Sequence, residues 1–305
     1  MAMITVLGHK SPDTDSVVSA IAYAYLLNAR RIEARPAVQG TINGETRFVL
    51  EKFGLNVPET VDRIAELEVA LVDSTEPGQL PPDIAGADIR YIVDHHNLGG
   101  LKTPAPIEVW TRPVGCTCTI LKLMFDFYRV EIPSDIAGAM MCAILSDTVM
   151  FKSPTTTAED KKAVDDLEKK SAMSAVDVGM EMMRVKSSVE NDSPEDLIGR
   201  DFKDFDIRGR KIGIGQIELV DLSLAAGKLP GIKAALQKLK KENGYFGILF
   251  MMTDIMKEGT ELIAYTDDDA KVEGIFGIRL KDNRAWCQGM MSRKKQVVPP
   301  LEENL

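Results

Sequence analysis

The segment that decides the fold lies at the start of the chain, where residues 3–31 read MITVLGHKSPDTDSVVSAIAYAYLLNARR. The short apolar run at residues 3–7 is typical of a buried strand, and residues 16–31, rich in Ala, Val, Leu and Tyr, are typical of a helix. A strand that leads directly into a helix is the first part of a βαβ unit. The polar stretch between them carries His9, Asp13 and Asp15, so an imidazole and two carboxylates follow the end of the strand.

The same alternation of short apolar runs and helical patterns continues through the first half of the chain. We expect further strands at residues 67–72, 89–93 and 107–110, and helices at 45–53, 117–128, 134–150, 158–170 and 175–185. A polar stretch at 187–193 ends before Pro194 and is typical of a linker. Beyond it we expect strands at 211–220, 245–253, 261–265 and 285–289, a helix at 225–243, and an extended tail at 297–300.

This order of elements predicts an α/β protein with two domains. Residues 1–186 would form an N-terminal domain with a doubly wound, mostly parallel sheet. Residues 194–305 would form a smaller C-terminal α/β domain, with residues 187–193 as the hinge linker between the two. The length of 305 residues also favours two domains, because single hydrophobic cores stop growing at about 250–300 residues.

The composition excludes several classes of partner. A formal net charge of −9 argues against nucleic acid and against anionic membranes, since both attract basic surfaces. No stretch approaches the roughly 20 apolar residues that a membrane-spanning helix needs, and residues 1–7 lack the basic start of a signal peptide. Four cysteines are too few for a disulfide framework at this length, which favours a reducing cytoplasm.

All three histidines lie in two short acidic clusters. His9 follows the first expected strand, Asp73 ends the apolar run at 70–72, and Asp94, His95 and His96 end the run at 91–93. Because ligands of an open parallel sheet gather at the carboxyl ends of its strands, these side chains should converge. Imidazoles and carboxylates without a cysteine nearby in the sequence favour Mn²⁺, Co²⁺ or Mg²⁺ over a structural zinc ion.

Asp147 is a further candidate ligand, because it lies in the apolar stretch at 143–150 and a carboxylate in such surroundings needs a partner. Simpler explanations exist for single members of the set. Asp73 alone would more often be a turn or cap residue, and Asp15 could be the N-cap of the helix that starts at residue 16. Their coincidence with the histidines at three strand ends favours a metal site.

These motifs resemble those of the family II inorganic pyrophosphatases, within the DHH phosphoesterase superfamily. The resemblance rests on GHKSPDTD at residues 8–15, DHH at 94–96, SDT at 146–148, KSPTTT at 152–157 and SRKKQ at 292–296. The motifs occur in the order of the family and span almost the whole chain. DHH alone would be weak evidence, because many phosphoesterases carry it.

The resemblance implies hydrolysis of pyrophosphate to two phosphates by metal-activated hydroxide, in a two-metal site between the domains. One Mn²⁺ would be held by His9, Asp13 and Asp73. The other would be held by Asp15, Asp73, His95 and Asp147, so that Asp73 bridges the ions. Co²⁺ could replace Mn²⁺, and a Mg²⁺ ion would arrive with the substrate.

The remaining roles follow from the same resemblance. Asp94 would orient an imidazole, and His96 would face the substrate and donate a proton to the leaving phosphate. Lys203, Arg293 and Lys294 would bind the phosphates, and the domains would close around the substrate. The family also implies a homodimer, and the partner would be pyrophosphate, with no nucleic acid and no membrane.

The chain departs from the family at one place, where Ser74-Thr75-Glu76 stands instead of His-Asn-Glu after the bridging aspartate. The absent histidine would not be a direct ligand, so metal binding should survive with altered support. Two alternatives stay open. One is an exopolyphosphatase or phosphodiesterase of the DHH type, although no histidine follows His96. The other is a non-catalytic, metal-dependent regulator, although every expected ligand is present.

Overall fold

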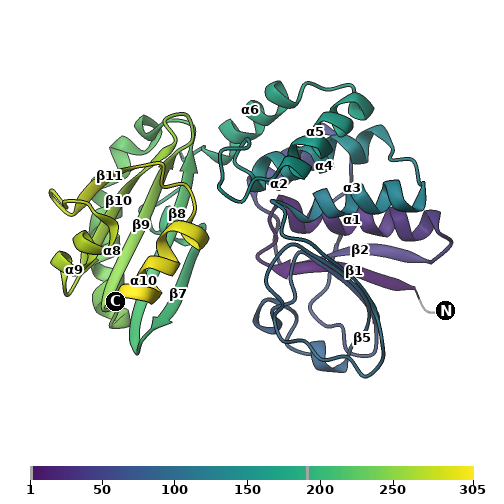
Figure 1. Ribbon diagram of the computed structural model, residues 1–305, viewed down its shortest axis with the longest axis horizontal. Helices are drawn as coiled ribbons and strands as arrows, with labels where there is room; N and C mark the ends of the chain where they lie inside the picture. Colours follow the sequence, from purple (N-terminus) through teal and green to yellow (C-terminus); the bar gives the residue numbers. More distant parts are fainter. Residues whose placement is uncertain (1–2, 190–191) are drawn as a thin grey trace. The chain divides into compact units, whose positions relative to one another are not determined.

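The computed structural model describes residues 3–189 and 192–305 and divides the chain into two compact units, each shown as a ribbon in Figure 1. The first unit consists of the described residues up to 151 together with 155–182. The second consists of residues 152–154 and of the described residues from 183 to 305. No helix in the described part of the chain has both the length and the apolar character needed to cross a membrane.

The first unit is built on a parallel sheet of six strands in the order β3-β2-β1-β4-β5-β6. The strands are β1 Ile4–Lys10, β2 Ala34–Gln39, β3 Glu59–Thr60, β4 Glu68–Val72, β5 Asp88–Asp94 and β6 Glu108–Thr111. The order reverses between β1 and β4, which lie side by side in the middle of the sheet. This is the doubly wound, parallel arrangement that the sequence predicts, and its point of reversal is the usual place for a ligand.

Six α-helices accompany this sheet in the described residues: α1 Thr14–Ala29, α2 Gly44–Lys52, α3 Thr117–Tyr128, α4 Ser134–Asp147, α5 Ala158–Ser171 and α6 Ala175–Lys186. Helix α1 packs on β1 and β2, and α3 packs on α1 and β5. Irregular segments also cover the strands, because Ile64 and Leu80 join Leu7, Leu71 and Ile92 in one buried cluster. Figure 1 shows α1 and α3 above β1 and β2.

Helix α4 ends earlier than the sequence suggests. The apolar pattern predicts a helix to residue 150, but Val149, Met150 and Phe151 have φ values of 50°, 53° and 64°, which no right-handed helix allows. Thr148 stabilises the end, since its hydroxyl donates to the carbonyl of Ile144 at 2.5 Å. The prediction of the helix end is therefore wrong, and Asp147 is the last helical residue.

The second unit contains a mixed sheet of five strands in the order β11-β10-β9-β8-β7, in which only β8 and β9 are parallel. The strands are β7 Phe202–Ile207, β8 Arg210–Leu219, β9 Gly247–Asp254, β10 Gly259–Thr266 and β11 Arg284–Gln288. The α-helices are α7 Pro194–Gly199, α8 Leu229–Asn243, α9 Asp269–Phe276 and α10 Val298–Asn304. Two buried clusters surround this sheet, one with Ile232 and Leu236 of α8 and one with Leu301 of α10. The predicted α/β character of this half is confirmed.

Two predictions for the second unit are wrong. The tail at 297–300 is not extended, because Arg293–Val297 forms a π-helical turn that continues into α10. Pro299 and Pro300 lie in the first turn of α10, where a missing N–H removes no helical hydrogen bond. The helix expected from residue 225 begins at Leu229, after a 3₁₀ helix at Leu222–Lys228.

The predicted hinge segment at 187–193 is only partly described, because residues 190 and 191 lie outside the described residues. Val189 is buried in the core of the second unit. The Ser187 hydroxyl accepts a hydrogen bond from the Val220 amide at 2.9 Å. Arg200 donates to the backbone carbonyls of Lys186 and Ser188. These contacts fix residues 187–189 to the second unit.

Candidate metal centre

The predicted ligands of the first unit converge at the carboxyl ends of three strands. His9 lies near the end of β1, Asp73 follows β4 directly, and Asp94 ends β5 with His95 and His96 after it. One group comprises His9, Asp13 and Asp73, and a second comprises Asp15, His95 and Asp147. Within each group, one possible ligand atom per residue lies within 4.8 Å of the others. These are the ligand sets that the resemblance implies, apart from the bridging role of Asp73 in the second.

Asp73 lies between the two groups. Its Oδ2 is 3.2 Å from Nε2 of His9, and its Oδ1 is 3.4 Å from Nε2 of His95. The backbone at Asp73 has φ 59°, a left-handed conformation that is uncommon outside glycine. Backbone strain of this kind persists only where the surrounding structure enforces it, and it clusters at functional sites. Asp73 therefore contacts the histidine of its own group and that of the second group.

The imidazoles of His9 and His95 are oriented by the backbone. Nδ1 of His9 lies 2.8 Å from the carbonyl oxygen of Lys10, and Nδ1 of His95 lies 3.0 Å from that of Val114. A carbonyl accepts only a hydrogen bond, so each Nδ1 must carry the proton. Each Nε2 then faces the carboxylates as the nitrogen that can bind a metal, an arrangement typical of metal-ligating histidine.

The two carboxylate oxygens of Asp13, at the start of α1, make different contacts. Oδ1 accepts from the Ser16 amide at 2.9 Å and caps the helix, while Oδ2 lies 3.5 Å from Nε2 of His9. The N-cap is therefore Asp13, so the alternative interpretation of Asp15 as the cap is wrong. Gly8 allows this close approach of strand and helix, because a Cβ at that position would lie 1.9 Å from Oγ of Ser16.

Asp15 is held by the N-terminus of another helix. Its Oδ2 accepts from the Thr117 amide at 2.7 Å, and its Oδ1 accepts from the Cys118 amide at 3.1 Å, both at the start of α3. The partial positive charge at a helix N-terminus favours the ionised carboxylate. The carboxylate is completely buried, and burial together with the charge of Asp73 raises its pKa to about 6.

The negative charge of the carboxylates dominates the electrostatics of the site. Burial alone would lower the pKa of His9, but Asp13 and Asp73 raise it to about 12. Burial opposes the shift of His95 too, and Asp73 and Asp15 raise its pKa to about 9. Conversely, His9 and His95 hold the pKa of Asp73 well below its usual value in spite of burial. The carboxylates therefore favour positively charged groups at this site.

Two cysteines lie near Asp15, although the sequence suggests no thiol close to the site. One ligand atom each of Cys116, Cys118 and Asp15 lies within 4.8 Å of the others. Burial raises the pKa of the Cys116 thiol far above its usual value, and raises that of Cys118 to about 11. Both cysteines are free and buried, and buried free cysteines ordinarily behave as small apolar side chains.

Asp94 orients His96. Oδ1 of Asp94 lies 3.0 Å from Nδ1 of His96 and also accepts from the His96 amide at 3.0 Å. If Nδ1 donates to this carboxylate, Nε2 of His96 is the nitrogen that can exchange a proton with a bound molecule. Asp94 itself is completely buried, whereas the His96 side chain is 39% exposed. The buried Asp94 carboxylate thus fixes the orientation of the accessible His96 imidazole.

The three cations predicted to bind phosphate belong to the second unit. Lys203 is an exposed residue of β7, and Lys294 is an exposed residue of the π-helical turn. Arg293 is buried, and its guanidinium donates to the Asp201 carbonyl at 2.7 Å, to Oδ1 of Asp201 at 2.7 Å and to the Ile214 carbonyl at 3.1 Å. These bonds hold the arginine in the second unit. Its role in substrate binding stays a prediction.

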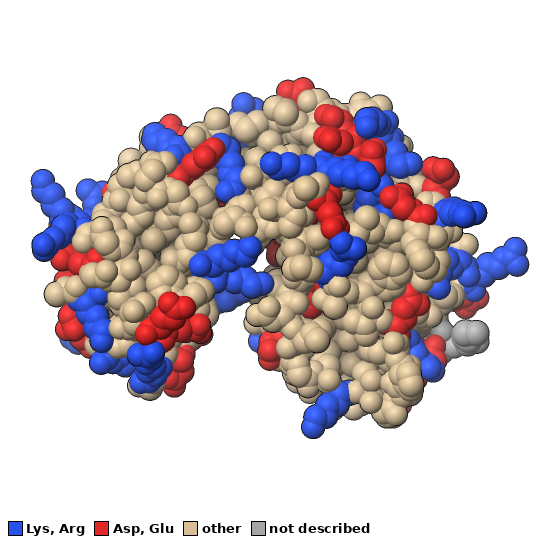
Figure 2. All heavy atoms as spheres, viewed as in Figure 1, with Lys and Arg blue, Asp and Glu red and all other residues tan. Residues whose placement is uncertain are grey.

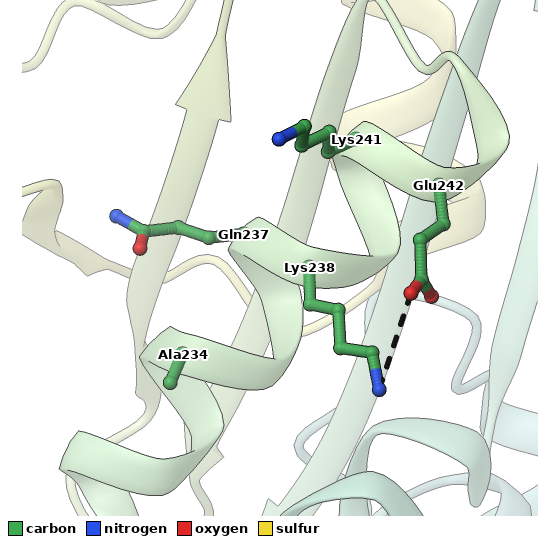
Figure 3. A pocket seen from close by; sticks show the side chains of 5 residues that line it. All are labelled: Ala234, Gln237, Lys238, Lys241 and Glu242. Carbon is green, nitrogen blue, oxygen red and sulfur yellow. Dashed lines mark ion pairs between the residues drawn. The ribbon is translucent and has the colours of Figure 1, made fainter.

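Figure 2 shows Lys and Arg interspersed with Asp and Glu on the visible face of each unit. A hollow of about 610 Å³ lies on the outer face of α8, lined by Ala234, Gln237, Lys238, Lys241 and Glu242 (Figure 3). All five residues come from one helix, so no second wall supplies converging polar groups. We therefore assign this hollow no ligand.

Sequence reasoning missed the groups that support the ligands. Besides its amide, Thr117 contributes a hydroxyl that donates to Oδ1 of Asp73 at 3.1 Å. Ser16 accepts from the His9 amide at 3.1 Å, and Ser19 donates to Asp15 at 3.0 Å. The only signal in the sequence is that Thr117 starts a predicted helix, whose first amides are free to bind an anion.

The chain is similar to known proteins over almost its whole length. The model of the DHH family N-terminal domain matches residues 3–144, and that of the DHHA2 domain matches residues 180–304. A relative from Archaeoglobus fulgidus, described as a "probable manganese-dependent inorganic pyrophosphatase", is 49% identical over 99% of this chain and 98% of its own length. A manganese-dependent inorganic pyrophosphatase from Methanothrix thermoacetophila is 43% identical over 98% of this chain and 97% of its own length.

The solved structures agree at the level of the whole fold. The crystal structure of a Methanococcus jannaschii protein described as a family II inorganic pyrophosphatase superimposes with a TM-score of 0.84. It is 41% identical and covers 99% of each chain. An exopolyphosphatase-related protein from Bacteroides fragilis shares the fold at a TM-score of 0.52, with 14% identity over 99% of this chain and 92% of its own. The chain therefore belongs to the family II, manganese-dependent inorganic pyrophosphatases of the DHH superfamily.

Proposed function

We propose that the chain hydrolyses inorganic pyrophosphate to two phosphate ions in a centre that holds two Mn²⁺ ions. One observation carries the proposal: two groups of possible ligand atoms, each within 4.8 Å, adjoin each other, because the Asp73 carboxylate of the first group contacts both His9 of its own group and His95 of the second group. Two divalent ions about 3.5–4 Å apart are the usual means of clamping an in-line displacement at phosphorus. The identity to curated pyrophosphatases over almost the full length supports the same activity.

The residues of the site fit the ions that the family uses. His9, Asp13 and Asp73 would hold one ion, and Asp15, Asp73, His95 and Asp147 the other. Imidazole nitrogens together with carboxylate oxygens suit Mn²⁺, and they also suit Co²⁺. Such ions would supply charge that stabilises the reacting phosphate and lowers the pKa of water. A Mg²⁺ ion carried by the substrate is a further part of this proposal, since pyrophosphate is itself a metal ligand.

His96 is the proposed proton donor to the leaving phosphate. Its Nδ1 is fixed by Asp94 at 3.0 Å, and its side chain is partly exposed, so Nε2 is accessible to a bound substrate. Asp94 would hold the imidazole in the orientation that proton transfer to the substrate needs. Lys203, Arg293 and Lys294 would neutralise the phosphates, the arginine through a planar fork and the lysines as point charges.

Domain limits, assembly and location complete the proposal. We propose residues 1–186 as the metal-binding domain, 194–305 as the substrate-binding domain and 187–193 as the hinge, which limited proteolysis should test.

We propose a homodimer, because strand β6 is an edge of its sheet and carries the exposed Val109. Light scattering would measure the mass. Four free, buried cysteines support a reducing cytoplasm as the location.

Phosphate release from pyrophosphate tests the function. The metal-stripped protein is loaded with Mn²⁺, Mg²⁺ is added, and released phosphate is measured against an Asp73→Ala variant. Asp177→Ala, which alters an exposed carboxylate on α6, is the matched control. We expect turnover on the order of 10 s⁻¹ or faster in the wild type and the control, and its loss in Asp73→Ala. Release from tripolyphosphate but not from pyrophosphate would favour an exopolyphosphatase instead.

A further inference from the structure

Glu45 is a buried carboxylate on α2 that belongs to neither group of predicted metal ligands. Its Oε1 accepts two hydrogen bonds from hydroxyls far away in the sequence. The Thr14 hydroxyl donates to it at 2.5 Å, and the Ser146 hydroxyl donates to it at 2.6 Å. Thr14 belongs to α1 and Ser146 to α4, so one oxygen joins three helices.

The two donors are direct neighbours of metal ligands in the chain. Thr14 lies between Asp13 and Asp15, and Ser146 immediately precedes Asp147. Asp15 and Asp147 belong to the same group of ligand atoms, yet they come from opposite ends of two different helices. The distance between these carboxylates therefore depends on how the first turn of α1 sits against the last turn of α4.

The position of Glu45 near the start of α2 does not by itself explain its contacts. A glutamate in a first turn is favourable for the helix dipole, but an exposed side chain supplies that effect. The cap of α2 is provided by Asn43, whose Oδ1 accepts from the Thr46 amide at 2.8 Å. Glu45 instead points away from its own backbone to the hydroxyls of α1 and α4. A second hydroxyl contact, between Thr14 and Thr46 at 3.2 Å, joins α1 and α2 at the same place.

We propose that Glu45 is a positioning residue that sets the separation of Asp15 and Asp147. It thereby sets the affinity of the site that these residues form with His95 for a divalent ion. The inference rests on the proposed function, because it requires that this group bind a divalent cation. Groups that orient metal ligands typically contribute 10–100-fold to metal affinity. Loss of Glu45 should therefore weaken one of the two Mn²⁺ sites about 10–100-fold and leave the His9 group less affected.

Mn²⁺ titration of the metal-stripped protein, followed by calorimetry and by Mn²⁺ electron paramagnetic resonance, tests the proposal. We compare the wild type with Glu45→Ala, Thr14→Val and Ser146→Ala. Glu51→Gln, at an exposed position of the same helix, is the matched control. We expect one of two sites to be weakened in the three variants and both to be intact in the control. At saturating Mn²⁺, kcat for pyrophosphate should return toward the wild-type value, because no group that contacts substrate has changed.

A second comparison separates positioning from a general effect on folding. If both hydroxyls act through Glu45, Thr14→Val and Ser146→Ala should weaken Mn²⁺ binding in the wild type but not further in Glu45→Ala. If the hydroxyl substitutions acted independently through folding, their effects would add to that of Glu45→Ala in the combined variants. Equal metal affinity of Glu45→Ala and wild type would refute the inference. If Glu45→Ala does not fold, unchanged affinity in both hydroxyl variants would refute it equally. Absence of Mn²⁺ binding by the wild type would refute the proposed function itself.

Discussion

The approach of β1 to α1 at Gly8 offers a sharp test of how the strand end is built. A Cβ at position 8 would lie 1.9 Å from Oγ of Ser16 and 3.2 Å from the Val72 carbonyl, so Gly8→Ala must displace the serine hydroxyl. That hydroxyl is buried and accepts the His9 amide at 3.1 Å. The substitution therefore both overpacks the site and breaks a partly buried hydrogen bond.

The magnitude follows from these two effects. Overpacking a tight site costs about 1–3 kcal/mol, and leaving the partly buried His9 amide without its acceptor costs about 1–3 kcal/mol. We expect Gly8→Ala to lower the free energy of unfolding of the first unit by about 2–6 kcal/mol. Ser16→Ala removes the acceptor alone and should cost about 1–3 kcal/mol. Because the double variant loses the hydrogen bond only once, its cost should fall below the sum by about 1–3 kcal/mol.

Urea unfolding with a chelator present measures these free energies without metal. The chain has two tryptophans, Trp110 in the first unit and Trp286 in the second, so a Trp286→Phe background lets Trp110 fluorescence report the first unit alone. Gly44→Ala is the control, because no atom lies within 4 Å of the added Cβ at the start of α2. It should leave stability unchanged or raise it by up to about 1 kcal/mol. Full additivity of Gly8→Ala and Ser16→Ala would refute the reasoning.

Three other perturbations have defined outcomes. Thr75→Val should cost about 1–3 kcal/mol in the same assay, because the Thr75 hydroxyl accepts the Gly99 amide at 2.8 Å, whereas Thr75→Ser should retain most of the stability. Burial raises the pKa of Asp166, but Lys122 at 3.2 Å lowers it below 3.8. The ion pair therefore stabilises the fold above that pH and loses its effect as pH falls. The stability difference between wild type and Lys122→Met should therefore shrink between about pH 5 and pH 2, and a constant difference would contradict the ion pair. Mn²⁺ at 100 times its dissociation constant should raise the free energy of unfolding by about 2.7 kcal/mol, and EDTA should reverse the shift in melting temperature.

Most of the first unit could be predicted because its elements are marked by local patterns. The apolar runs that form β1, β4 and β5 are short, and the helical pattern of α3 agrees with the structure at both ends. Strand β2 was not predicted, since its sequence ARPAVQ contains an arginine and a proline. A proline removes one donor from the ladder and argues against a central strand. Neighbouring strands on both sides compensate for that loss.

The errors in the second half have a common cause. Strand β7, FKDFDI, alternates with charged residues that an edge strand exposes to solvent, so it resembles a loop in composition. The tail with two prolines resembles an extended segment, yet it forms a helix that buries Leu301 against the core. In both places tertiary contacts override the local preference of the chain.

The candidate site was predictable to the extent that its side chains follow strand ends. His9, Asp73 and His95 could be chosen because each one interrupts or ends an apolar run. The supporting groups could not be chosen, because several of them act through the backbone. The Val114 carbonyl orients His95, and the Thr117 amide binds Asp15 across 102 positions of sequence. A carbonyl or an amide is present at almost every residue, so composition cannot single one out.

The sequence by itself determined the alternation of strands and helices, the residue types of the metal ligands and the family to which the chain belongs. Only the tertiary structure decided that β1 lies beside β4, which nitrogen of each imidazole faces the carboxylates, and that Glu45 joins α1 to α4. The physical reason is the range of the interactions. Periodicity reports which face of one element is buried, whereas strand order and shared hydrogen bonds depend on residues far apart in the chain.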